Sequence, residues 1–167
     1  MITPFEKLSD SARIWIYQSD RPFTPEELKL IEEKAGAFIT SWAAHGQDLL
    51  ASTTVLHNLF LIVSADEDFN MASGCSIDSQ FRFVQQLGTE LKIDFFNRMN
   101  IAFLKGEGVA IIPMSQLKQE VEKGNIQPDS TFFDNNIQTK EQLDNAWLKL
   151  AADSWLSRYL KTQKNVV

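Results

Sequence analysis

The chain holds one cysteine, and the residues around it make it the first candidate for chemistry. Cys75 lies in the stretch Ser73–Ser79 (SGCSIDS), among small polar residues and just ahead of a helical pattern. The partial positive charge of a helix N-terminus favours the thiolate over the thiol. Cys75 is therefore a candidate nucleophile.

His45 is the candidate partner of this thiol. It lies in Trp42–Gly46 (WAAHG), where an earlier helical pattern ends. The helix dipole favours an imidazolium at that position, and an imidazolium beside a thiolate activates cysteine nucleophiles. Asp78 either orients His45 as the third member of a catalytic triad or caps the following helix.

The same stretch also supports binding without catalysis. Backbone N–H groups of residues 74–77 are expected to form an anion pocket or an oxyanion hole. The candidate ligand-binding residues are Trp42, Ser73, Gly74, Ser76 and Ser79. We interpret the site as one for a small molecule or anion, with a Cys75-dependent hydrolase or transferase as the alternative. The structural alternatives are a cysteine that only packs, and capping by Ser76 or Asp78.

Composition limits the class of protein. The 167 residues predict a single domain, 1–167, with a sheet and two helices in 1–113 and a helical extension in 114–167. The net charge of −6 argues against nucleic acid and anionic lipid as partners. No signal-peptide or membrane-spanning pattern is present, so we expect a cytoplasmic protein. With two histidines and one cysteine, neither a zinc site nor any cofactor is expected.

The first half of the chain predicts alternating strands and helices. Residues 12–18 read as a strand, and Thr24, Pro25 and Glu27 form a helix start with a capping box. Residues 51–56 and 60–65 read as a hairpin that turns at His57-Asn58. The predicted buried stripe of the first helix is Leu28, Ile31, Ala35, Phe38 and Trp42, and that of the second is Ile77, Phe81, Val84, Leu87 and Leu91.

The second half predicts two strands and then mostly helix. Residues 99–104 and 109–112 read as a hairpin, and 114–123 as a third helix that stops at Gly124. Residues 125–138, with Phe132-Phe133, read as an irregular segment that either folds over another part of the protein, as a lid, or stays mobile. A helix is predicted over 139–151, capped by Thr139 with Gln142, and a last one from Ser154. The helix over 139–151 is expected to turn Leu143, Ala146, Trp147 and Leu150 inward.

This order of elements predicts an α+β fold with a ferredoxin-like split β-α-β core of about five antiparallel strands and a helical C-terminal extension. In that topology the first helix ends where the second begins. Trp42, His45 and the Ser73–Ser79 stretch are then expected at one end of the sheet, with the 105–108 turn. The opposite end is expected to hold Asp20, Arg21, His57 and Arg98, and it competes as the functional end.

Three stretches carry a resemblance. Trp15–Arg21 (WIYQSDR), Trp42–Gly46 and Ser73–Ser79 resemble a family of small uncharacterised proteins from Bacteroidetes with W-x-x-H-G and S-G-C-S-I-D-S motifs. The resemblance covers most of the chain. Members often carry the label "ABC transporter ATPase", but this sequence lacks the G-x-x-x-x-G-K-[ST] loop that such an ATPase needs. The resemblance implies that the two motifs act together, and it implies no catalytic roles.

Overall fold

The fold is α+β, with two antiparallel sheets and helices beside them. The computed structural model describes residues 2–44, 50–66 and 74–164. The chain divides into two compact units. Unit 1 comprises Met1–Asn97 and Ile137–Asp144, and unit 2 comprises Arg98–Asn136 and Asn145–Val167. The assignment of 1–167 to one domain, with a change at residue 113, stays a prediction.

Unit 1 is built on a three-stranded sheet in the order β1-β3-β2. Its strands are β1 (Arg13–Gln18), β2 (Leu50–Leu56) and β3 (Phe60–Asp66), and both pairings are antiparallel. The predicted hairpin turn is confirmed. His57 and Asn58 have φ of 55° and 51°, the left-handed values that match the twist of paired strands.

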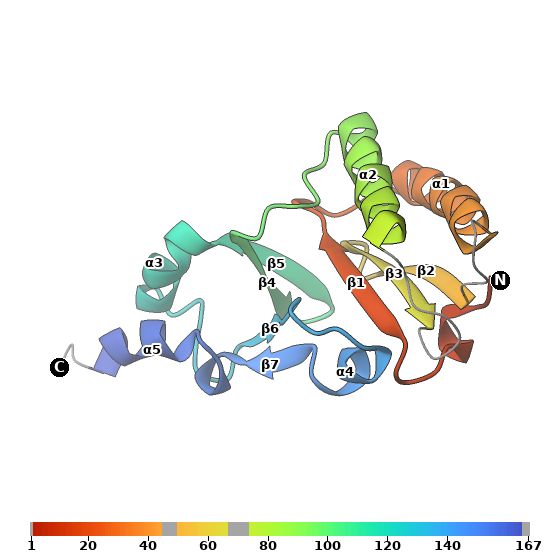
Figure 1. Ribbon diagram of the computed structural model, residues 1–167. Coiled ribbons are helices and arrows are strands. Elements are labelled where there is room, and N and C mark those ends of the chain that lie inside the picture. Colours follow the sequence, from red (N-terminus) through yellow and green to blue (C-terminus); the bar gives the residue numbers. More distant parts are fainter. Residues whose placement is uncertain (1, 45–49, 67–73, 165–167) are drawn as a thin grey trace. The chain divides into compact units, whose positions relative to one another are not determined.

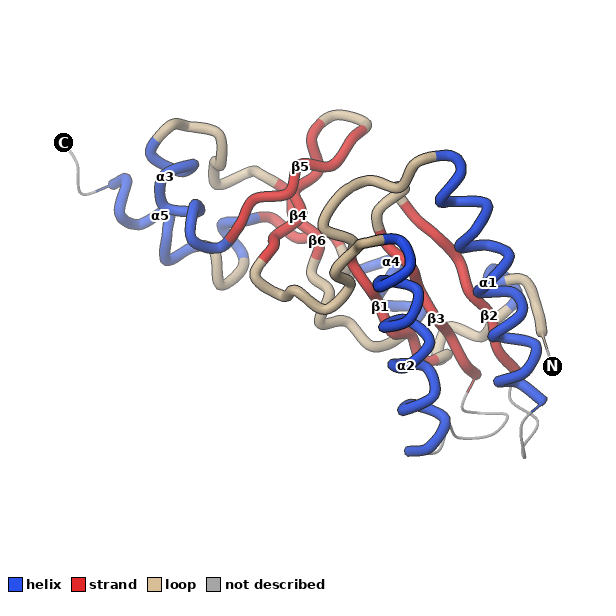
Figure 2. The backbone as a smooth tube through the Cα atoms, turned by 90° about the horizontal axis from the view of Figure 1, so that it is seen from above, coloured by secondary structure: helices blue, strands red, loops and turns tan. Residues whose placement is uncertain are grey.

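Two long helices, α1 (Pro25–Ala44) and α2 (Gly74–Leu91), cover one face of this sheet (Figures 1 and 2). The predicted start of α1 is confirmed. Thr24 N–H donates to Glu27 Oε1 at 2.8 Å, and Glu27 N–H donates to Thr24 Oγ1 at 3.2 Å. The core between helices and sheet includes Tyr17, Ile31, Ile39, Trp42, Leu61, Val63, Val84 and Leu87.

The start of α2 differs from the prediction. The helix begins at Gly74, so Ser76 and Asp78 lie inside its first two turns, and their predicted capping role is wrong. The predicted buried stripe is also wrong at Phe81, which is 43% exposed. Gln80 is fully buried one position earlier.

Residues 137–144 return to unit 1 beside β1. Thr139 forms an antiparallel bridge with Arg13, and Ile14 N–H donates to the Gln138 carbonyl at 2.9 Å. The predicted cap is confirmed, because Gln142 N–H donates to Thr139 Oγ1 and Thr139 N–H donates to Gln142 Oε1. The helix α4 (Lys140–Asn145) ends well before residue 151, which corrects the predicted length.

Unit 2 is built on a four-stranded antiparallel sheet in the order β5-β4-β6-β7. The strands are β4 (Asn100–Lys105), β5 (Gly108–Pro113), β6 (Thr131–Phe133) and β7 (Leu148–Leu150). The helices α3 (Leu117–Glu122) and α5 (Ser157–Lys164) complete its core, which includes Phe103, Ile112, Leu117, Val121, Phe132, Leu156 and Leu160. The strand that would complete a ferredoxin-like sheet, β4, pairs here with β5 and β6.

Three predictions for this part of the chain are corrected. Phe132 and Phe133 lie in β6 and are buried, so they form no lid. Leu150 lies exposed in β7 and not inward on a helix. The strands form two sheets in place of one, so residues 114–167 are not a purely helical extension.

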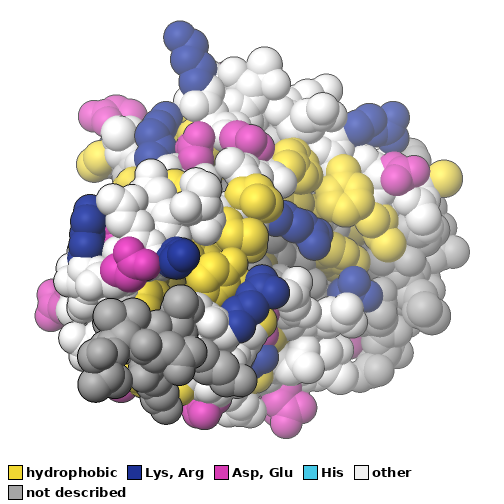
Figure 3. Space-filling model, turned by 90° about the vertical axis from the view of Figure 1, so that its left-hand side faces the viewer, with side chains coloured by type: hydrophobic (Ala, Val, Ile, Leu, Met, Phe, Trp, Pro, Cys, Tyr) yellow, Lys and Arg dark blue, Asp and Glu magenta, His cyan; other side chains and the backbone are white. Residues whose placement is uncertain are grey.

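Figure 3, seen from the side of α3 and α5, shows hydrophobic side chains at the surface beside lysine and arginine side chains.

Candidate functional site

A hydrogen bond joins the end of α1 to the start of α2. The buried Trp42 donates its indole N–H to the Ser76 carbonyl at 2.8 Å. The structure therefore brings together two of the predicted ligand-binding residues, 34 positions apart in the chain. His45, Gly46 and Ser73 lie outside the described residues, so the pairing of His45 with Cys75 stays a prediction.

The predicted nucleophile is accessible. Cys75 is the second residue of α2, and its thiol is free and exposed. Its carbonyl accepts a hydrogen bond from Ser79 Oγ at 3.0 Å, within the helix. Asp78 is exposed on the next turn, and the space around the Gly74 Cα is open. A ligand can therefore reach the first turn of α2 without displacing a described side chain.

Arg13 is a residue of this end that sequence reasoning missed. It opens β1, and its guanidinium carbon lies 5.1 Å from the centre of the Trp15 ring. Trp15 in turn meets Trp42 edge to face, with ring centroids 6.2 Å apart. A line of side chains thus leads from Arg13 through both tryptophans to Ser76. The sequence indicates this role only weakly, through an arginine at the start of β1 that is followed at alternate positions by the aromatic residues Trp15 and Tyr17.

One donor of the Arg13 guanidinium has no acceptor among the residues that the structure describes. Its Nε is shielded from solvent and has no hydrogen-bond partner within the described part of the chain. Arginine carries five N–H donors and stays charged in proteins. Most buried polar groups are paired, so this atom requires an explanation.

A second unpaired donor belongs to Gln80 of α2, which contacts β1 through Tyr17. Gln80 Oε1 accepts the hydroxyl of Tyr17, while Gln80 Nε2 is buried with no partner among the residues described. Burial raises the pKa of Tyr17, so its hydroxyl stays protonated and can donate. Arg13, Trp15 and Tyr17 alternate along β1 and so share its helix-covered face.

Two features of this end attract a negative ligand: the start of α2 and the guanidinium of Arg13. The first turn of α2 carries no acidic side chain, whereas that of α1 carries Glu26 and Glu27. The positive end of the α2 dipole is therefore not compensated within its first turn. Arg13 adds a positive charge at the same end of the sheet, where Asp66, buried at the end of β3, and the exposed Asp78 of α2 are opposing charges.

The opposite end of unit 1 is occupied by an ion pair. Arg21 donates two hydrogen bonds to Glu27, at 2.8 and 2.7 Å, and a third to the Leu91 carbonyl at 3.1 Å. The hydrogen bonds from Arg21 and then from the Thr24 N–H lower the pKa of Glu27 to about 2. The hydrogen bond with Glu27 raises the pKa of Arg21. Arg21 thus joins the start of α1 to the end of α2 and has its charge neutralised.

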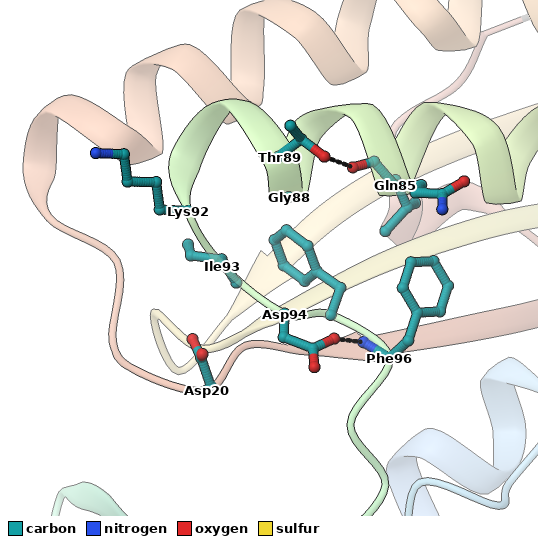
Figure 4. Close-up of a pocket in the computed structure, with 10 residues that line it drawn as sticks. Asp20, Gln85, Gly88, Thr89, Lys92, Ile93, Asp94 and Phe96 are labelled. Carbon is teal, nitrogen blue, oxygen red and sulfur yellow. Dashed lines mark hydrogen bonds between the residues drawn. The ribbon is translucent and has the colours of Figure 1, made fainter.

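An open pocket of about 450 Å³ lies at this second end (Figure 4). Its lining residues are Asp20, Val84, Gln85, Gly88, Thr89, Lys92, Ile93, Asp94, Phe95 and Phe96. Asp94 Oδ1 accepts the Phe96 N–H at 2.9 Å, and Lys92 extends away from Phe96. With the carboxylates of Asp20 and Asp94 and the negative end of α2, this pocket is unfavourable for an anion.

The remaining site classes find no support among the residues that the structure describes. No group of three or more His, Cys, Asp or Glu is arranged to hold a metal ion there. None of the described helices is both long enough and apolar enough to cross a membrane. Comparison with protein-family models, curated proteins and solved structures gives no match for this chain.

Proposed function

We propose that unit 1 binds a small anionic molecule at the end where α1 stops and α2 starts. The hydrogen bond from Trp42 to the Ser76 carbonyl carries this proposal, because it joins the two motifs that the sequence singled out. The uncompensated N-terminus of α2 and the charge of Arg13 support a negative ligand. The ligand-binding residues are Trp42, Gly74, Ser76 and Ser79, with Ser73 completing the stretch.

A second candidate is a hydrolase or transferase that uses Cys75 as its nucleophile, with His45 and Asp78 as partners. The exposure of Cys75 on the first turn of α2 favours it, because a nucleophile must be reachable. The two candidates differ in what the thiol does. A binding protein needs the helix terminus and not the sulfur, whereas the enzyme loses turnover without it.

The test is a thermal-shift screen of anionic metabolites against the wild-type protein and the Cys75→Ser variant. Binding predicts a saturable rise in Tm that the variant retains. Rapid alkylation of Cys75 by iodoacetamide near neutral pH, with loss of a ligand-dependent reaction in the variant, would favour the enzyme instead. The binding proposal fails if no anion stabilises the wild type.

We further propose a cytoplasmic location, in keeping with one free cysteine. Unit 1, with its order β1-α1-β2-β3-α2, is proposed to be a ferredoxin-like arrangement without its fourth strand. Membership of the Bacteroidetes family named above is likewise a proposal, supported by the Trp42–Gly46 and Ser73–Ser79 motifs.

A further inference from the structure

We propose that Arg13 is the residue that binds the anion, and that the ligand presents a carboxylate or a phosphate. This inference rests on the proposed function and adds a residue that the two motifs do not contain. It starts from the Nε of Arg13, which is shielded from solvent and has no acceptor within the described part of the chain. An unpaired buried donor destabilises the folded state, and it does so more strongly when the group is charged.

Nothing in the described residues relieves this cost. No described carboxylate forms an ion pair with Arg13, and no described carbonyl accepts a hydrogen bond from its guanidinium. The stacking on Trp15, with 5.1 Å between guanidinium carbon and ring centre, holds the group by its face. Stacking leaves the two terminal nitrogens, which are not among the sealed atoms of this partly exposed side chain, free to donate in the guanidinium plane.

Gln80 shows a similar deficit at a second position. The two buried side-chain atoms that lack a partner among the described residues are Arg13 Nε and Gln80 Nε2, and both are donors. Gln80 bonds to Tyr17, four residues along β1 from Arg13, so the two unpaired donors are separate. The one at Arg13 lies at the end of unit 1 where α2 begins, and an oxyanion bound by Arg13 supplies an acceptor there.

The chemistry of arginine narrows the class of ligand. Its planar fork matches the two oxygens of a carboxylate or a phosphate, and such paired hydrogen bonds are the strong ones. A halide offers no second oxygen and fits this fork poorly. Carboxylate and phosphate both offer paired oxygens to the fork. The experiment therefore has to distinguish between these two ligands.

The experiment compares Arg13→Met with Arg82→Met. Methionine keeps an unbranched apolar chain against Trp15, and Arg82 is an exposed arginine of α2 whose loss removes the same charge. Tm is measured in sodium chloride, sodium phosphate and sodium acetate at equal ionic strength. Arg13→Lys, which keeps the charge but lacks the fork, is measured beside them.

We expect phosphate or acetate to raise the Tm of the wild type and of Arg82→Met, and the responding salt identifies the oxyanion. Arg13→Met loses this shift, and its Tm in chloride is unchanged or higher because an unpaired charge has been removed. Arg13→Lys binds roughly 10- to 100-fold more weakly than wild type.

Two results would overturn the role of Arg13. The first is an anion shift that Arg13→Met retains in full, which leaves an anion site of the proposed kind but assigns it to other residues. The second is a Tm in chloride that falls in Arg13→Met, because the guanidinium then already has an acceptor within the chain. If neither salt shifts the wild type, the proposed function fails together with this inference.

Discussion

At the scale of single residues, the pair Tyr17 and Gln80 sets the polarity of the layer between sheet and helices. Their hydrogen bond joins β1 to α2 inside the core, and both side chains are buried. A polar pair of this kind contributes little net stability while it is intact. Removing one partner is costly, because the other stays buried with nothing to bind.

This asymmetry predicts the outcome of a double-mutant cycle. Tyr17→Phe leaves the Gln80 amide without any partner and should lower the free energy of unfolding by about 1–3 kcal/mol. Gln80→Met strands the Tyr17 hydroxyl and should cost a similar amount. The double variant removes both side-chain polar groups of the pair and strands neither, so it should be at least as stable as either single variant. Urea unfolding of the four proteins measures this, and strictly additive losses would contradict it.

Arg13 shows where single-residue reasoning from sequence stops. The pattern of β1, with polar and aromatic residues in alternation, places Arg13 on the same face as Trp15. Whether its guanidinium finds an acceptor depends on residues far away in the chain, and no local pattern reports it. Cys75 is a candidate from the sequence because it is the one cysteine of the chain, whereas Arg13 becomes a candidate only because the structure gives its Nε no acceptor among the described residues.

At the scale of elements, the start of α1 contains an ion pair between Arg21 and Glu27 that is joined by two hydrogen bonds. Glu27 accepts from Arg21 and from the Thr24 N–H, and its side chain is 15% exposed. Its pKa falls from an ordinary 4.5 to about 2. The folded state therefore binds this proton less readily than the unfolded chain does. The resulting stability is complete above pH 4.5 and is lost as the pH falls toward 2.

Glu27→Gln should remove this pH dependence. At neutral pH the variant should unfold more easily than wild type, and the difference should shrink as the pH falls through the interval from 4.5 to about 2. Chemical denaturation across that interval measures it. Glu26→Gln, which removes an exposed carboxylate from the same turn, is the matched control and should leave the slope unchanged. Parallel curves for wild type and Glu27→Gln would refute the role of the ion pair.

The end of α2 holds a residue in an unfavourable backbone conformation. Lys92 follows the helix with φ of +57°, and Ile93 N–H reaches back to the Gly88 carbonyl at 2.9 Å. This is the helix ending that usually has glycine at the left-handed position. Gly88 itself cannot be replaced, because an added Cβ would lie 2.5 Å from the Ile93 carbonyl oxygen.

Lys92→Gly should therefore stabilise the protein, by about 1 kcal/mol, since it removes the left-handed strain. Lys29→Gly is the matched control. It makes the same substitution at an exposed position inside α1, where glycine should cost about 1 kcal/mol. Urea midpoints that move in opposite directions would confirm the assignment. A loss of stability in Lys92→Gly would show that its side chain contributes more than its backbone costs.

The elements also show why part of the fold could be read from the sequence. The start of α1 and the turn at His57-Asn58 are local signals, and both are confirmed. The strands β6 and β7 were missed because three residues are too few to show a period of two. Leu150 also fits the helical spacing that begins at Leu143, so the sequence pattern predicts a helix through residues that form β7 in the structure.

At the scale of the whole molecule, the chain leaves unit 1 and returns to it. Residues 98–136 belong to unit 2, and 137–144 rejoin unit 1 beside β1. The return is held by main-chain bonds from Ile14 N–H to the Gln138 carbonyl and from Lys140 N–H to the Ala12 carbonyl, each 2.9 Å long. The Lys140 ammonium also donates to the carbonyls of Glu6 and Leu8. Unit 1 therefore depends on a segment far away in sequence.

This discontinuity predicts that a fragment of residues 1–97 is incomplete. Without 137–144 the Ile14 N–H and the Ala12 carbonyl lose their partners, and the start of β1 loses its neighbour on that side. The Ile14 amide should then exchange with solvent much faster than in the full chain. Ile62, in the central strand β3, is the internal control and should stay protected if the sheet forms at all.

Lys140→Pro in the full chain tests the same idea without truncation. Position 140 is the first residue of α4, where proline is well tolerated, so the substitution removes the N–H and ammonium bonds while leaving the helix start intact. Lys140→Met removes only the ammonium bonds. Exchange at Ile14 should increase in the order wild type, Lys140→Met, Lys140→Pro. Equal protection in all three proteins, and in the fragment, would mean that β1 is held by β3 alone and that the return of the chain adds nothing to unit 1.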